Sequence, residues 1–271
     1  MEKKTKESLV KLQDYFTYLQ TYIDSEAPLQ LPHFQLNQHE RRVVQKKLIE
    51  LIECLKGTHR EKLTKLCEDM QLVRRDLHRL QSPLPWIKVD AIYHLGAMRS
   101  DQAVSGLMNT LKSNKYGPNA FIVARSIAQC ASEVEHLREM VQLVVRYGKN
   151  FHSLVADIIT ESEMDCTPFM LKFLNQEDSD SVHIALAGLP AHVVPSQAPR
   201  LYRLLGSGNQ EIRMKAGKLL YSDNYAMVQD DEKQVDDHLR TQTGRLLRNK
   251  RQQQASHRLS RNEPYTKSAQ S

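Results

Sequence analysis

The feature that most constrains the fold of this chain is a regular spacing between small apolar residues. They recur at steps of 33, 32, 30 and 30 residues, at Ala91, Ala124, Ala156, Leu186 and Ala216. A second series recurs at steps of 33, 31 and 30 residues, at Leu107, Met140, Leu171 and Leu201. A near-constant period in both series predicts repeated helix pairs. Because one pair cannot bury its apolar face alone, the pairs are expected to pack on their neighbours.

The stretch WIKVDAIYHLGAMRSDQAVSGLMNTL, residues 86–111, serves as the template for one pair. Three apolar residues spaced four apart share one face of its first helix, namely Ile87, Ala91 and Leu95. Gly96 is predicted to end this helix, since glycine suits the left-handed residue that follows a helix C-terminus. Ser100, followed by an aspartate, is predicted to cap the second helix.

The repeat resembles the HEAT-repeat family in its short bacterial form. The residues that carry the resemblance are IKVDAIYHLG at 87–96, VHIALAGL at 182–189 and IRMKAGKLL at 212–220. The resemblance implies an all-α fold, a right-handed α-solenoid of about five HEAT-like helix pairs with an N-terminal helical cap. It also implies a binding scaffold, because the motif specifies a fold and little chemistry. Similar bacterial proteins often carry an N-terminal membrane anchor, of which the residues after Met1 show no sign.

The ends of the repeat region predict four further segments. Residues 1–36 are expected to form a helix and an extended linker, with the helix docked on the cap or pairing with a partner. Residues 37–85 are expected to form a helical hairpin that caps repeats 86–221. Asn37 is predicted to cap its first helix, Gly57 to end it, and Thr58 with Glu61 to form a capping box. Residues 222–251 are predicted to form a C-terminal helix, and residues 252–271 a disordered basic tail.

The positive charge of the chain lies at its C-terminal end. The formal charge is +6, with 38 basic and 32 acidic residues. Residues 240–271 hold eight basic residues and one acidic residue, so the rest of the chain holds 30 basic and 31 acidic residues. The basic residues proposed to bind a polyanion are Arg240, Arg245, Arg248, Lys250, Arg251, Arg258 and Arg261.

The sequence holds no recognisable catalytic or metal-binding motif. The four cysteines form no Cys-x-x-Cys pair and are interpreted as buried, reduced thiols of a cytosolic protein. No metal or cofactor is therefore expected. The acidic stretches ESEMD (161–165) and EDSDS (177–181) are interpreted as helix caps on solvated loops. Trp86 and Asp90 lie one helical turn apart, which resembles the groove of HEAT-like DNA glycosylases.

These observations predict a non-enzymatic, cytoplasmic scaffold that binds another protein through its concave face. The second helices are expected to line that face, and the basic residues proposed to meet an acidic partner are Arg138, Arg146, Lys172, Arg200 and Arg203. The alternative is a nucleic-acid-binding protein that uses the basic tail, with or without a glycosylase-like groove. Peripheral association with an anionic membrane through the same tail is a third interpretation.

Overall fold

The computed structural model describes residues 2–113, 117–147, 151–189 and 194–225, and within them it contains helices and no strands. The α-helices are α1 (Glu2–Tyr22), α2 (Gln38–Cys54), α3 (Thr58–Asp69), α4 (Leu72–Arg79), α5 (Pro85–Met98), α6 (Val104–Lys112), α7 (Ala120–Cys130), α8 (Val134–Val144), α9 (His152–Thr160), α10 (Thr167–Leu174), α11 (Ser179–Gly188), α12 (Val194–Leu204) and α13 (Gln210–Tyr225). Short 3-10 helices are η1 (Asp101–Ala103), η2 (Gly117–Asn119) and η3 (Val145–Tyr147). The predicted all-α class is confirmed. No described helix is long and apolar enough to cross a bilayer.

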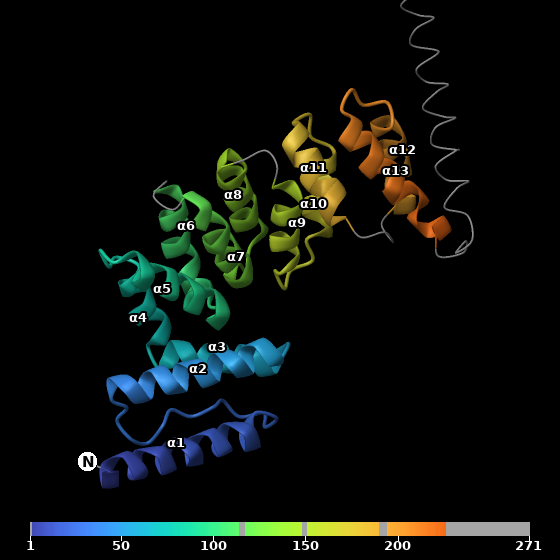
Figure 1. Cartoon of the computed structure of the whole chain (residues 1–271). Coiled ribbons are helices and arrows are strands. Elements are labelled where there is room, and N and C mark those ends of the chain that lie inside the picture. Colours follow the sequence, from blue (N-terminus) through green and yellow to red (C-terminus); the bar gives the residue numbers. More distant parts are fainter. Residues whose placement is uncertain (1, 114–116, 148–150, 190–193, 226–271) are drawn as a thin grey trace, which may run out of the picture. The chain divides into compact units, whose positions relative to one another are not determined.

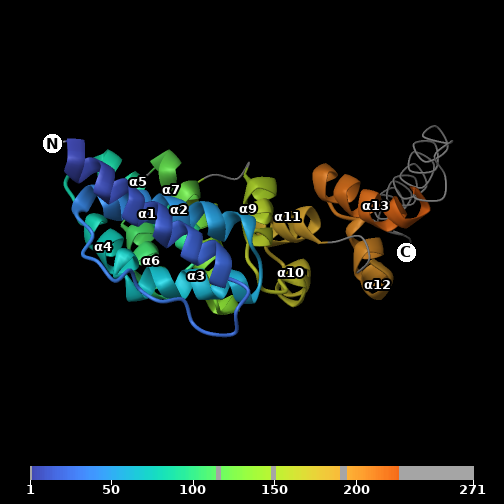
Figure 2. The same cartoon turned by 90° about the horizontal axis from the view of Figure 1, so that it is seen from below.

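The chain divides into two compact units, Met1–Gly188 and Leu189–Ser271. In the first unit, α1 packs against α2, as the docking interpretation expects (Figures 1 and 2). The apolar face of α1 buries Leu12, Tyr15 and Leu19. The Tyr15 hydroxyl donates a hydrogen bond to the Gln30 carbonyl, 3.0 Å away, which fastens the extended linker to the helix.

Helix α2 begins as the sequence predicts. The Asn37 side chain accepts a hydrogen bond from the backbone N–H of Glu40, and the Glu40 carboxylate accepts one from the N–H of Asn37, so the two form a capping box. The predicted capping box of Thr58 and Glu61 is wrong. Thr58 is already the first helical residue, and Gly57, with φ of +58°, occupies the cap position.

The long helix expected after Thr58 is interrupted. Helix α3 ends at Asp69, Gln71 adopts a left-handed conformation with φ of 59°, and α4 starts at Leu72. The SPLP sequence then ends the hairpin as expected, because proline at position 85 suits the first turn of α5. Helix α4 packs against α3 and α5 and buries Leu72, Val73 and Asp76.

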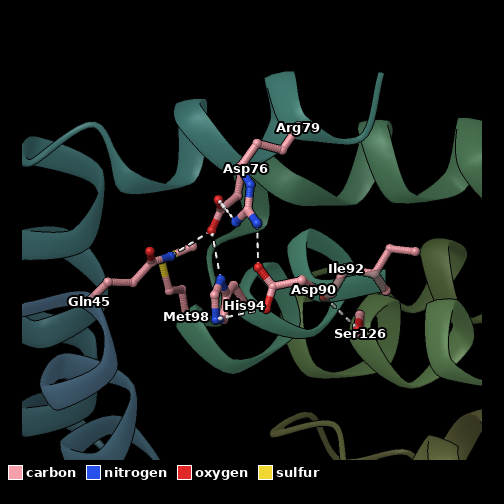
Figure 3. A network of polar contacts seen from close by, with 8 residues as sticks. All are labelled: Gln45, Asp76, Arg79, Asp90, Ile92, His94, Met98 and Ser126. Atoms are coloured by element: carbon pink, nitrogen blue, oxygen red, sulfur yellow. Dashed lines mark hydrogen bonds and ion pairs between the residues drawn. The ribbon is translucent and has the colours of Figure 1, made fainter. Parts of the chain in front are cut away.

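Gly96 does not end a helix, contrary to the prediction. Helix α5 continues to Met98, and Arg99 takes the left-handed position with φ of 54°. Gly96 instead lies where α5 and α7 cross. A Cβ atom added there would stand 2.6 Å from Ser126 Oγ and 2.8 Å from Ser126 Cα. The Ser126 hydroxyl donates a hydrogen bond to the Ile92 carbonyl at 2.9 Å (Figure 3). Moving α7 away from α5 to make room for a Cβ would break this hydrogen bond.

We therefore expect Gly96→Ala to lower the free energy of unfolding by about 1–3 kcal/mol, the usual cost of forcing an extra group into a packed contact. Gly106→Ala is the matched control. Its added Cβ would meet only the flexible end of the Leu77 side chain, 2.6 Å away, which can rotate. Urea unfolding followed by circular dichroism compares the two variants. Equal midpoints for wild type and Gly96→Ala would contradict the close approach of α5 and α7.

The predicted repeat positions are buried in the described helices. The first-helix series Ala91, Ala124, Ala156, Leu186 and Ala216 is buried throughout. In the second series Leu107, Met140 and Leu201 are buried, whereas Leu171 is only half-buried. Its neighbours Met170 and Leu174 take the core positions of α10. The period thus locates the helix crossings to within one residue.

Four alternate helices of the first unit pack in succession. Helix α5 contacts α7, α7 contacts α9, and α9 contacts α11 (Figure 1). The helices between them pack on this series, with α6 and α8 against α7 and α10 against α11, and α6 also contacts α8. In the second unit α12 packs against α13, and Leu201, Ile212 and Ala216 are buried there.

The cysteine interpretation needs one correction. Cys67 and Cys130 are buried thiols, Cys166 is half-buried, and Cys54 at the end of α2 is exposed. Burial raises the pKa of Cys67 and of Cys130 to about 12. These two thiols are therefore protonated and unreactive at neutral pH.

Candidate functional site

A cavity of about 1200 Å³ opens between α2, α4 and the first turns of α5. We call it the cap cavity. Its lining residues are Gln38, Arg42, Gln45, Lys46, Arg75, His78, Arg79, Gln81, Ser82, Pro83, Trp86, Ile87, Asp90 and His94. Four of these are Lys or Arg and only one is a carboxylate, so the wall is strongly cationic.

A buried carboxylate organises one side of the cap cavity (Figure 3). Asp76 on α4 is fully buried. Its Oδ2 accepts a hydrogen bond from Gln45 Nε2 at 2.6 Å, and its Oδ1 accepts one from Arg79 at 2.8 Å. Burial alone would raise the pKa of Asp76, but the neighbouring His94, Arg79 and Gln45 side chains outweigh it and lower the pKa. Asp76 is therefore ionised and holds three elements together.

Arg79 joins the buried carboxylate to a surface one. Its guanidinium pairs with Asp76 and also with Asp90 on α5, which is half-exposed. Burial would lower the pKa of Arg79, yet the hydrogen bonds to Asp76 and Asp90 raise it. His94 lies between the same two acids, with Nδ1 3.4 Å from Asp76 and Nε2 3.6 Å from Asp90. Both distances are longer than a typical hydrogen bond.

Three cations of the cap cavity lack such a partner. Arg42 and Lys46 lie one turn apart on α2, and Arg75 lies on α4; none of them forms an ion pair with a residue that the structure describes. Burial lowers the pKa of Arg75, and the neighbouring cations Arg79 and Arg42 lower it further. Asp76 offsets part of that effect. Positive charge is therefore concentrated here without a counter-ion from the described chain.

Two further side chains complete the cap cavity. Gln45 is 1% exposed, and its Oε1 has no hydrogen-bond partner among the described residues. Its amide nitrogen is engaged by Asp76, which fixes the oxygen as an acceptor facing away from that carboxylate (Figure 3). Trp86 is 66% exposed and is the one tryptophan of the chain. Trp86 and Asp90, which the sequence places one turn apart, both line this cavity.

The basic residues predicted for a concave face lie on α8, η3 and α10 of the first unit and on α12 of the second. Arg138 on α8 pairs with Glu135 at 2.7 Å within its own helix. Arg146 in η3 lines a cavity of about 310 Å³ beside Asp178 and Asp180. Lys172 is exposed on α10. Arg200 and Arg203 belong to α12, in the second unit.

The basic tail lies outside the described residues. This applies to each of its proposed polyanion-binding side chains, namely Arg240, Arg245, Arg248, Lys250, Arg251, Arg258 and Arg261. The predicted C-terminal helix and tail, residues 222–251 and 252–271, lie outside it too, apart from the end of α13 at Tyr225.

The two acidic stretches have different roles. In EDSDS, the Asp178 carboxylate accepts hydrogen bonds from the N–H groups of Asp180 and Ser181, which confirms a cap for α11. In ESEMD, Asp165 likewise accepts from the N–H of Thr167. Two other acids of ESEMD do more than cap, which corrects the interpretation as a solvated loop. Glu161 pairs with Arg125 at 2.8 Å, and Glu163 pairs with Arg60 and Arg99.

Neither the comparisons with known proteins nor the grouping of side chains identifies a family or a metal site for the described residues. No protein-family model matches the chain, and a search of curated proteins finds no match. Among the described residues, no three His, Cys, Asp or Glu side chains are grouped as metal ligands would be. The function must therefore be argued from the cap cavity itself.

Sequence reasoning missed most of this cavity. Its residues come from α2, α4 and α5, and only the spacing of Trp86 and Asp90 was visible within one helix. Arg42 and Lys46 read as an ordinary solvated face of α2. One available signal was Asp76, because a lone carboxylate in an otherwise apolar helix stripe needs a buried partner.

Proposed function

We propose that this chain is a non-enzymatic, HEAT-like α-solenoid of stacked helix pairs, and that it binds a partner protein at the cap cavity. The period of 30–33 residues and the successive packing of α5, α7, α9 and α11 support the repeat architecture. In such a stack each pair contacts only its neighbours, and the surface left over serves for binding.

The observation that carries the binding role is the composition of the cap cavity. The exposed Trp86 lines the cavity together with Arg42 and Arg75, which form no ion pair with a residue that the structure describes. Trp and Arg are among the residue types that contribute most to protein–protein affinity when an interface buries them. We therefore propose the partner site at the N-terminal cap rather than on the basic residues of α8 and α10.

The contacts of Asp90 argue against a glycosylase-like role. A general base must be free to take a proton, whereas Asp90 is paired with Arg79 and approached by His94. We expect the purified chain to release no base from alkylated DNA. Base release that disappears in Asp90→Asn would contradict the non-enzymatic proposal.

Partner capture by the full chain tests the binding role. We expect extracts of the source cells to yield the same protein with wild type and with the double variant Arg41→Gln/Arg74→Gln. We expect Arg42→Gln/Arg75→Gln to lose it, because these two residues line the cap cavity and their sequence neighbours do not. High salt should weaken the capture. Equal recovery with both double variants would contradict binding at this cavity.

A further inference from the structure

The geometry of the cap cavity points to the chemistry of what it binds. We propose that it accepts a short, extended acidic segment whose carboxylates contact Arg42, Lys46 and Arg75 and whose backbone donates to Gln45. This inference rests on the proposed function and names the partner's recognised feature. Three observations support it, namely the spread of the cations, the acceptor oxygen of Gln45 and the exposure of Trp86.

The cations are distributed along the cavity rather than gathered at one point. Arg42 and Lys46 lie four residues apart on α2, so their stems leave the helix about 6 Å apart. Arg75 faces the same space from α4. Several carboxylates along a chain match this arrangement better than one compact anion does. Each added Arg–carboxylate contact also gains from bidentate geometry.

The acids near the cavity form no ion pair with these cations among the described residues, although Asp76 raises the pKa of Arg75. Asp76 is enclosed by Gln45, Arg79 and His94, and it is fully buried. Asp90 is occupied by Arg79. The charge of Arg79 is thereby satisfied within the chain, and the charges of Arg42, Lys46 and Arg75 remain available for a ligand. The buried network also holds α4 against α2 and α5, so the site is built before the ligand arrives.

The Gln45 oxygen favours a peptide over a simple anion. It is buried and has no hydrogen-bond partner among the residues that the structure describes, and leaving a buried acceptor unpaired costs free energy. A fully ionised carboxylate carries only acceptors and cannot donate to it. A peptide segment has a backbone N–H at nearly every residue, so it can donate to Gln45 while its carboxylates contact the cations.

Trp86 supplies an apolar surface beside the charges. Its ring lies on the first turn of α5, next to Ile87 in the wall of the cavity. An apolar residue of the segment would remove the exposed ring from water, which is favourable in proportion to the area buried. The proposed segment is therefore acidic and carries one apolar residue that packs against Trp86.

The experiment uses the full chain and a defined probe. The probe is an acetylated and amidated octapeptide of Glu and Asp with a central Leu, and its control replaces each acid with Gln or Asn. Because Trp86 is the one tryptophan, its fluorescence reports on the cavity directly. We expect the acidic peptide to change this fluorescence and the neutral peptide to leave it unaltered. Calorimetry gives the affinities, including that of Trp86→Phe.

The variants test the contacts. We expect Arg42→Gln/Arg75→Gln to weaken peptide binding by about tenfold or more, since desolvated Arg anchors commonly carry that much affinity. We expect the matched control Arg41→Gln/Arg74→Gln to bind within about twofold of wild type, as rim charges contribute little. Thermal unfolding confirms that each variant is folded.

Several results would overturn the inference: no peptide binding to folded wild type, equal binding by the two double variants, or equal binding of the neutral peptide. Displacement of the peptide by an equal concentration of inorganic phosphate or single-stranded oligonucleotide would overturn it too. Failure of the proposed function looks different. If the peptide binds as expected but no partner depends on Arg42 and Arg75, the scaffold role fails. If a partner does depend on them but no acidic peptide binds, the inference about its chemistry fails.

Discussion

Asp76→Ala is expected to lower the free energy of unfolding by about 3 kcal/mol, because it removes one member of a buried ion pair and leaves its partners unsatisfied. Gln45 Nε2 would lose its acceptor, and Arg79 would lose the contact that draws α4 toward α5. We place the effect at the lower end of the usual range, because Arg79 is partly exposed and retains Asp90. Denaturant unfolding followed by circular dichroism measures it.

Asp90→Asn is the control for this prediction. Asp90 contacts the same Arg79 but is half-exposed, so its loss should cost less than about 1 kcal/mol. A second check uses pH. The pKa of Asp76 is lowered below 3.8 in the folded chain, so its contribution is complete above pH about 4 and is lost as pH falls through the folded pKa. Equal destabilisation by the two substitutions at neutral pH would show that Asp76 does not organise the cap.

The repeat could be predicted from sequence because it depends on local, periodic information. A small residue such as Ala91 or Ala124 is needed wherever two helices approach closely, and its recurrence is visible along one line of sequence. The capping box of Asn37 and Glu40 is visible for the same reason, since both partners lie within one turn.

The prediction that Gly96 ends a helix was wrong, because the local sequence pattern has two explanations. Gly96 satisfies the sequence signature of a helix end, but the same residue is needed where Ser126 approaches the helix backbone. The two demands look alike in sequence, and only the position of α7 distinguishes them. Thr58 failed similarly, because Gly57 takes the cap position and begins α3 one residue earlier than expected.

The cap cavity depends on contacts that no periodicity encodes. Gln45 and Asp76 are 31 residues apart, and Arg79 and Asp90 are separated by the SPLP turn. Their approach follows the break at Gln71, after which α4 packs against α5 and its Asp76 contacts Gln45 of α2. The residues at this break include no proline or glycine, so the sequence does not indicate that the helix is interrupted there. The sequence therefore predicts a helical hairpin here and not the site that the hairpin builds.

The repeat architecture leads to the second large effect, on α7. Ala124→Glu is expected to lower the free energy of unfolding by more than about 3 kcal/mol, because it introduces an unpaired charge into a packed interior. Ala124 is fully buried, and α7 packs against α5, α6, α8 and α9. Shifting α7 to accommodate a glutamate would therefore disrupt its packing against the other helices.

Ile122→Glu is the matched control, since it places the same charge on the same helix two residues away. Ile122 is 40% exposed, so the carboxylate can reach water there and the change should cost less than about 1 kcal/mol. Denaturant unfolding of both variants separates burial from helix propensity, which is common to the two. If helix pairs stack through the first helices, the loss at Ala124 must also weaken protection against amide hydrogen exchange in α5 and α9. A variant that unfolds α7 alone, with α5 and α9 as protected as in wild type, would show that the pairs are independent and would remove the main support for a stacked repeat.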